Sequence, residues 1–130
     1  MKKTALRAEF KAKRNALTET QASAMDLLIF EELTRFDWSN IEYLHCYLAI
    51  SKFKEFDTLP FIEWIWTNYP SIKIVISKSD FKTHLLQHFI LEKDTELQHN
   101  SWDIPEPVNA VLVDPLLIDV VLAPLLAVDV

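Results

Sequence analysis

The chain contains no glycine in 130 residues, and this absence restricts its folds and binding sites more than any other feature. At the usual glycine frequency of about 7%, a chain of this length holds about nine. P-loop and Rossmann fingerprints need glycines because their backbone amides approach phosphates closely only where side chains are missing. Any nucleotide site within these residues therefore works without a glycine-rich loop.

The pattern of apolar residues predicts helices and strands in alternation. Helices are expected over residues 3–17 and, after a capping box at Thr18 and Gln21, up to about Phe36. A third helix begins at Asp57 or Thr58, with Pro60 in its first turn. The expected strands are residues 41–50, 72–77, 85–91, 111–113 and 119–123, of which the last is an apolar run typical of a central strand. We predict an α/β fold of three layers, a largely parallel sheet with helices on both faces.

One domain is expected over residues 1–130, because half of the residues are hydrophobic and supply a sizeable core. The ending, DVVLAPLLAVDV at residues 119–130, reads as a buried strand that leads into a loop. Such a strand needs neighbours on both faces. We therefore expect the chain to be incomplete at its C-terminus.

The single cysteine and the sequences of the two terminal segments indicate the cellular compartment of the protein. The single cysteine, Cys46, lies in the apolar run IEYLHCYLAI, where a buried, reduced thiol is expected. The N-terminal MKKTALRAEF lacks the apolar core of about 7 to 15 residues that a signal peptide needs. The apolar C-terminal segment is interrupted by aspartates and prolines and is not expected to span a membrane. A cytoplasmic protein without a membrane partner is predicted.

Positive charge is concentrated at the N-terminus. Residues 1–14 hold six of the 13 basic residues and one acid, a net +5, so the remaining residues carry −11 of the chain's total of −6. A nucleic-acid-binding protein spreads basic residues over a broad face, so this pattern favours a compact anion over nucleic acid. On a helix, Lys3, Arg7 and Arg14 share one side. Either these side chains extend to water, or Lys3 and Arg7 form a phosphate clamp.

The stretch NSWDIPEP at residues 100–107 places an indole before a stiff segment. Pro105 and Pro107 fix the backbone and bias the residues before them toward an extended shape. Two interpretations of Trp102 remain open. It caps the core from a loop, or it is held rigidly at the wall of a binding site.

Other polar and aromatic residues suggest no additional site. His84, His88 and His99 have no acid or cysteine at metal-ligand spacing, so no metal site is expected within the chain. His45 and Cys46, adjacent on a strand, point to opposite faces and cannot form a catalytic pair. Asp103 and Glu106 are expected in solvent. The run FIEWIWTNY at residues 61–69 is expected to be a helix face packed on the sheet.

Five segments in sequence resemble one enzyme family. They are KTALR at residues 3–7, Arg14, YLAI followed by EFDT at residues 47–58, SWDIPEP at residues 101–107, and LIDVVLAPLLAVD at residues 117–129. Their order and spacing are similar to those of 5-formyltetrahydrofolate cyclo-ligase, also called methenyltetrahydrofolate synthetase. The glycine-rich GxGxGxYD segment that follows in this family, and holds ATP phosphates and the folate, is missing here, so the 130 residues alone are expected to be inactive. The sequence also departs from the family at SKFK, residues 51–54, and at PLLA, residues 124–127.

The resemblance implies a reaction, its substrates and some of its binding residues. The family closes 5-formyltetrahydrofolate to 5,10-methenyltetrahydrofolate and releases ADP and phosphate, with Mg²⁺. By resemblance Lys3 and Arg7 contact the ATP phosphates, while Ile50, Glu55 and Trp102 bind the folate. The resemblance names no catalytic residue and implies a monomer, with self-association expected if the chain is truncated. Two alternatives are a non-catalytic folate or nucleotide binder on the same fold and an interaction module that uses the apolar tail.

Overall fold

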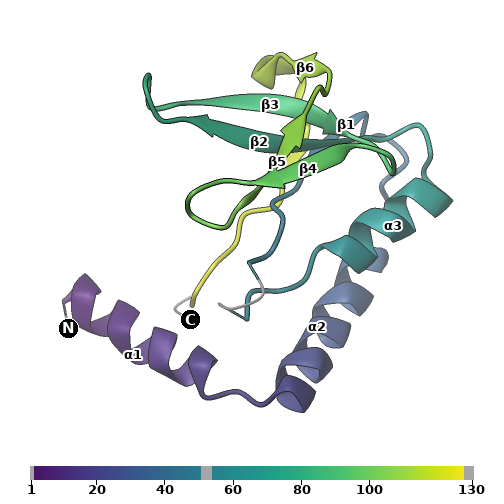
Figure 1. The fold of residues 1–130 in the computed structure, drawn as a ribbon. Helices are drawn as coiled ribbons and strands as arrows, with labels where there is room; N and C mark the ends of the chain where they lie inside the picture. The colour runs from purple at the N-terminus through teal and green to yellow at the C-terminus, as the bar shows by residue number, and fades with distance from the viewer. Residues whose placement is uncertain (1, 51–53, 128–130) are drawn as a thin grey trace.

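The computed structural model describes residues 2–50 and 54–127, which contain three α-helices (Figure 1). These are α1 (Lys3–Asn15), α2 (Glu19–Thr34) and α3 (Leu59–Asn68). The predicted capping box is confirmed. Thr18 N donates to Gln21 Oε1 at 3.0 Å, and Gln21 N donates to Thr18 Oγ1 at 3.1 Å. The start of α3 is confirmed too, with Pro60 in its first turn and Leu59 N donating to Asp57 Oδ1.

Seven strands form two sheets in the described part of the chain. They are β1 (Tyr43–His45), β2 (Lys73–Asp80), β3 (Leu85–Leu91), β4 (Glu96–His99), β5 (Pro105–Val108), β6 (Leu112–Val113) and β7 (Val120–Val121), and the 3-10 helix η2 (Pro115–Leu117) precedes β7. The larger sheet has the order β6-β3-β2-β1-β7. The α/β class is confirmed. Strand β1 is parallel to β2 and β7, whereas β3 is antiparallel to β2 and β6. The turn between β2 and β3 is too short for a parallel crossover.

The strand expected over residues 41–50 is shorter than predicted, because the backbone leaves the sheet after His45. Cys46 N still donates to Val75 O, at 2.9 Å. One residue further along, the Tyr47 carbonyl accepts from the side-chain hydroxyl of the fully buried Thr58 at 2.6 Å. This side-chain bond joins the segment after β1 to the start of α3.

The prediction of a central strand over residues 119–123 is wrong. Strand β7 contains two residues and, among the described strands, pairs only with β1, at the edge of the sheet. The Val121 side chain is 59% exposed. An apolar run indicates that side chains avoid water, but it does not tell whether they face a sheet neighbour or line a cavity.

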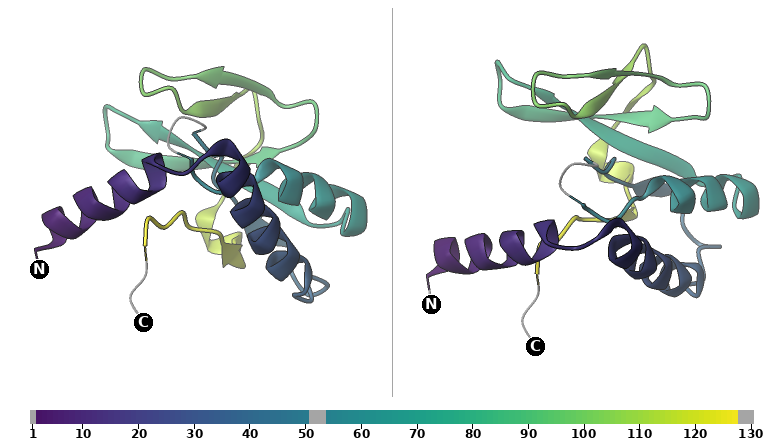
Figure 2. Two further views of the ribbon diagram at one scale, coloured as in Figure 1. Left: turned by 90° about the horizontal axis from the view of Figure 1, so that it is seen from below. Right: turned by 60° about the horizontal axis from the view of Figure 1, so that its bottom comes forward.

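The hairpin β4–β5 was not predicted, and it covers one face of the larger sheet. In Figure 2, right, it lies on the side of β2 and β3 opposite α2 and α3, where a second layer of helices was expected. The solvated position expected for Glu106 is wrong. Its side chain is 8% exposed and accepts a hydrogen bond from Ser79 N, in β2, at 3.1 Å. Strand β5 was not predicted because its prolines lack the backbone N–H donors that a strand normally has.

The core lies between the sheet and α3. It is built from Trp38, Leu44, Cys46, Phe61, Ile62, Ile65, Ile72, Ile74, Ile76 and Leu91. The aromatic run of α3 therefore packs on the sheet as predicted. The Cys46 thiol is buried, as expected, and burial raises its pKa to about 12. None of the helices in the described part of the chain is long and apolar enough to cross a membrane.

Candidate functional site

A cavity lies where the chain leaves the parallel strands β1 and β7. Ligands of α/β proteins bind outside the carboxyl ends of parallel strands. The segments that follow β1 and β7 both run from the sheet toward α1 and α2 (Figure 1). Together they enclose a cavity of about 510 Å³, lined by Phe10, Lys13, Arg14, Leu17, Ala22, Met25, Asp26, Ile29, Leu33, Tyr47, Lys54, Glu55, Phe56 and residues 122–126.

Glu55 and Ile50, two of the residues predicted to bind folate, lie together beside this cavity. Ile50 N donates to Glu55 Oε1 at 3.2 Å, and Glu55 lines the cavity. The bond holds one carboxylate oxygen in place. Their role in folate binding stays a prediction.

Both acidic and basic residues line the cavity. Burial raises the pKa of Asp26, and the neighbouring charge of Asp57 adds to this effect, while a hydrogen bond from the Asp57 backbone opposes it. The pKa of Tyr47 is raised to about 12, first by burial and then by the negative charges of Glu55 and Asp26. Lys13 and Arg14, from α1, and Lys54 add positive charge to the same lining.

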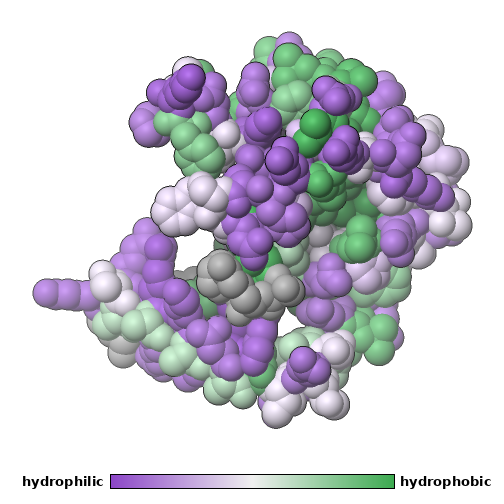
Figure 3. Space-filling model, viewed as in Figure 1, coloured by the Kyte–Doolittle hydropathy of each residue, from purple (hydrophilic) through white to green (hydrophobic). Residues whose placement is uncertain are grey.

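Lys3 and Arg7, the predicted phosphate clamp, line an open groove of about 1110 Å³ along α1. Its other residues are Leu6, Phe10, Lys11, Arg14 and residues 124–127. Both predicted side chains are exposed, so the structure brings them to one groove without choosing between contact with water and contact with phosphate. The space-filling view shows an opening beside α1, below the sheet (Figure 3).

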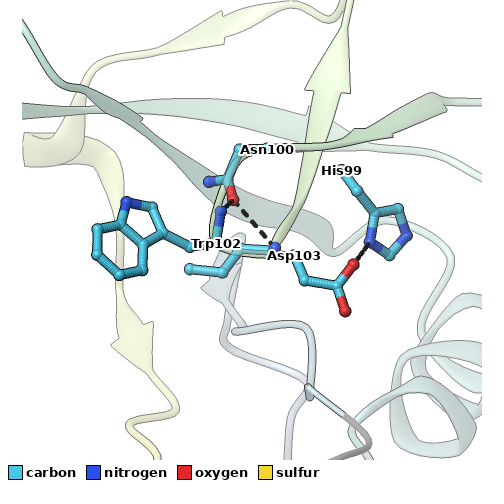
Figure 4. A network of polar contacts seen from close by, with 5 residues as sticks. His99, Asn100, Trp102 and Asp103 are labelled. Atoms are coloured by element: carbon cyan, nitrogen blue, oxygen red, sulfur yellow. Dashed lines mark hydrogen bonds and ion pairs between the residues drawn. The ribbon is translucent and has the colours of Figure 1, made fainter.

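Trp102 lines neither of these two spaces and lies in the turn between β4 and β5 (Figure 4). The interpretation as a core cap is wrong, because Trp102 is 67% exposed. Asn100 Oδ1 accepts from Trp102 N at 2.8 Å and from Ile104 N at 3.1 Å. His99 Nδ1 lies 2.9 Å from Asp103 Oδ1. The turn is thus held by side chains, and it presents the indole on the side away from His99 and Asp103.

Residues 1–130 match the 5-formyltetrahydrofolate cyclo-ligase family. The chain belongs to this family. The resemblance carried by its five segments is therefore confirmed.

Two solved structures share the cyclo-ligase fold. The NMR structure of 5,10-methenyltetrahydrofolate synthetase from Aquifex aeolicus has 19% sequence identity and a TM-score of 0.78, and the match covers 93% of this chain and 59% of that chain. The synthetase from Mycoplasma pneumoniae has 23% identity and a TM-score of 0.66, with coverage of 96% and 65%. The chain thus spans less than two thirds of the length of either protein. No curated protein matches it.

Lys54 is a site residue of the cyclo-ligase chain that sequence reasoning missed. Its Nζ donates to Asn15 O at 2.8 Å and also to Leu17 O, so it joins the segment that carries Glu55 to the end of α1. Because these partners are 39 and 37 residues away, no local pattern predicts the contact. The only feature of the sequence that distinguished this position was the departure from the family pattern at residues 51–54.

A second polar cluster lies on the face of the sheet that points away from α3. His45 Nε2 is 2.6 Å from Ser77 Oγ, and Ser77 Oγ is 2.9 Å from His88 Nδ1. The Ser77 hydroxyl has one proton, so it can donate to only one of the two imidazoles. His45 and the buried Cys46 do point to opposite faces, as predicted.

This cluster predicts a pH dependence of stability. Burial first, and then the charge of His88, lower the pKa of His45 below its usual 6.5. As pH falls below that value, the unfolded chain binds a proton more readily than the folded chain, so stability is lost. The free energy of unfolding, measured by urea titration between about pH 7 and pH 5, is expected to fall less steeply for His45→Gln than for the wild type.

The matched control is His84→Asn, which changes an exposed histidine in the β2–β3 turn. It is expected to keep the wild-type dependence on pH. Equal slopes for His45→Gln and the wild type would contradict the assignment.

Proposed function

We propose that this chain serves the ATP-dependent cyclisation of 5-formyltetrahydrofolate to 5,10-methenyltetrahydrofolate, with release of ADP and phosphate. The observation that carries the proposal is the family match over residues 1–130. The adjoining cavity and groove support it, because the reaction needs two substrates to meet. We further propose a monomeric, cytoplasmic protein, consistent with the buried free thiol of Cys46.

The chemistry requires the formyl oxygen to become a leaving group. That oxygen attacks the terminal phosphorus of ATP, a new P–O bond forms, and ADP leaves with the electron pair of the broken bond. The folate N10 then attacks the activated formyl carbon and loses its proton, and phosphate departs with the former formyl oxygen. Catalysis consists mainly of aligning the substrates and neutralising phosphate charge.

Lys3 and Arg7 are proposed to hold the ATP phosphates in the groove. They lie one turn apart on α1 and line the same space, a geometry that suits charge-assisted bonds to phosphate oxygens. The described residues contain no group of three or more His, Cys, Asp or Glu side chains that could hold a metal ion. Magnesium in nucleotide sites is held largely by phosphates and water, so Mg²⁺ is proposed to arrive with ATP and to offset phosphate charge there.

Glu55 is proposed to bind the pterin of the folate in the cavity. One of its oxygens is fixed by Ile50 N, and a carboxylate can also accept hydrogen bonds from ring nitrogens. The apolar residues of the cavity wall suit the largely apolar faces of the folate ring system. Ile50 is proposed to lie at the same site. Trp102 is proposed to contact bound folate from the β4–β5 turn, where its indole is exposed.

The test of the function is to measure substrate binding by calorimetry and product formation by the absorbance of the methenyl compound. We expect the protein that carries these residues together with the glycine-rich segment of the family to bind both substrates, and to form product only when ATP is present. Binding of folate or ATP by that protein without product would favour the alternative of a non-catalytic binder. Failure of the wild-type chain to bind either substrate would overturn the proposal.

Glu55→Gln is expected to weaken binding of 5-formyltetrahydrofolate about 10-fold and to leave ATP binding unchanged, because it removes charge-assisted bonds but preserves shape. Dissociation constants from calorimetry measure both effects. The control is Glu31→Gln, an exposed position on α2. Equal folate affinity for Glu55→Gln and the wild type would exclude the carboxylate from the site.

A further inference from the structure

The cavity beside Glu55 and the groove along α1 share part of their walls. The shared residues are Phe10, Arg14, Pro124, Leu125 and Leu126. Arg14 is the one charged residue among them. It therefore lies at the junction of the two spaces.

Arg14 also has a donor that no other described residue satisfies. Its Nε is buried and has no hydrogen-bond partner within the described ranges. The neighbouring cations differ in this respect, because Lys13 pairs with Glu9 at 2.8 Å and Lys54 donates to the end of α1. A buried donor without a partner is unfavourable, and more so on a charged group. An anion at the junction would supply what Arg14 lacks.

The reaction proposed above places such an anion at the junction. If ATP phosphates lie in the groove with Lys3 and Arg7, and folate lies in the cavity with Glu55, the phosphoryl group passes between the two spaces. It carries negative charge throughout its transfer, spread over its outer oxygens. A guanidinium matches such a group because its donors form a planar fork.

We infer that Arg14 binds the terminal phosphoryl group of ATP while it is transferred to the formyl oxygen. The inference rests on the proposed function. It makes Arg14 a catalytic residue, whereas Lys3 and Arg7 hold ATP by phosphates along α1. Arg14 would then contribute to the affinity for a nucleoside triphosphate and contribute little to the affinity for a diphosphate or for folate.

The experiment measures binding of three probes by calorimetry: the non-hydrolysable triphosphate AMP-PNP, ADP and 5-formyltetrahydrofolate. For Arg14→Met we expect about a 10- to 100-fold loss of affinity for AMP-PNP and a change of less than about twofold for the other probes. Arg14→Lys keeps the charge without the fork and is expected to lose part of that affinity. Arg35→Met, which changes an exposed arginine that lines neither space, is the matched control and is expected to bind all three probes normally.

Each other result would overturn the inference. An equal loss for AMP-PNP and ADP would place Arg14 at an inner phosphate, and a loss confined to 5-formyltetrahydrofolate would place it at a folate carboxylate. Unchanged binding of AMP-PNP would leave Arg14 a surface residue of α1. If Arg14→Met does not fold, judged by circular dichroism, Arg14→Lys decides with the same criteria. A wild-type chain that binds none of the probes would refute the proposed function, and the role of Arg14 with it.

Discussion

Replacing Arg7 with alanine is expected to raise the dissociation constant for ATP about 10- to 100-fold while the constant for 5-formyltetrahydrofolate changes less than twofold. A hydrogen bond between charged groups contributes about 1.5 to 3 kcal/mol, and about 1.4 kcal/mol corresponds to a factor of ten. Arg7 lines the groove along α1 and does not line the cavity that contains Glu55. The loss is therefore expected for one substrate only. Titration calorimetry with each substrate measures both constants.

The control for Arg7 is Lys2→Ala, which removes a positive charge just before α1 from a residue that does not line the groove. It is expected to change ATP affinity less than about threefold, since an exposed charge acts through screened solvent. If Arg7 only extends into water, Arg7→Ala and Lys2→Ala will have the same small effect. That result would remove Arg7 from the phosphate site.

The helices and the core could be predicted from the sequence because their signals are local. The capping box at Thr18, the proline in the first turn of α3 and the apolar run around Cys46 each lie within a few residues of the structure they specify. The hairpin β4–β5 could not be predicted, since prolines mask it and its buried Glu106 bonds to Ser79, 27 residues earlier. Pairing across such distances leaves no periodic pattern.

The candidate site, like the fold, could be predicted from the sequence only in part. A resemblance to known sequences pointed to Lys3, Arg7 and Glu55, and the structure places them around adjoining spaces. Neither the junction position of Arg14 nor the contact of Lys54 with α1 could be predicted. Both depend on how α1 packs against segments far away in sequence, and α1 itself has no buried residue that would reveal its packing.

Because the chain contains no glycine, other residues adopt the positive φ angles that some of its turns require. Four described residues have positive φ angles: Lys54 (51°), His84 (59°), Asp103 (61°) and Asn109 (55°). Histidine, aspartate and asparagine are the residues that most often replace glycine there. Lysine has no such tendency, and a left-handed residue other than glycine costs about 1 kcal/mol or more. The contacts of the Lys54 side chain offset this cost.

Lys54→Met is therefore expected to lower the free energy of unfolding by about 2 to 3 kcal/mol and to loosen α1. The change removes a cation from the end of the helix, where it interacts favourably with the helix dipole. It also leaves the carbonyls of Asn15 and Leu17 without a charged donor, and bonds to charged groups contribute about 1.5 to 3 kcal/mol. Urea titration measures the free energy, and amide hydrogen exchange measures the opening of α1.

The consequence for binding follows from where Lys54 lies. The Lys54 side chain bonds to the end of α1, the helix that carries Lys3, Arg7 and Arg14. Lys54 directly precedes Glu55 in the chain, so this bond joins α1 to the segment that carries Glu55. With that link removed, ATP and folate are each expected to bind with an affinity within about threefold of the wild type. The rate of product formation is expected to fall about 100-fold, because a misplacement of about 1 Å between reacting groups has about this effect. Lys54→Arg, which keeps the charge and donors, should retain most of the rate, and Lys82→Met, in the exposed β2–β3 turn, should retain all of it. Wild-type exchange in α1 together with a wild-type rate for Lys54→Met would show that the link does not position the substrates.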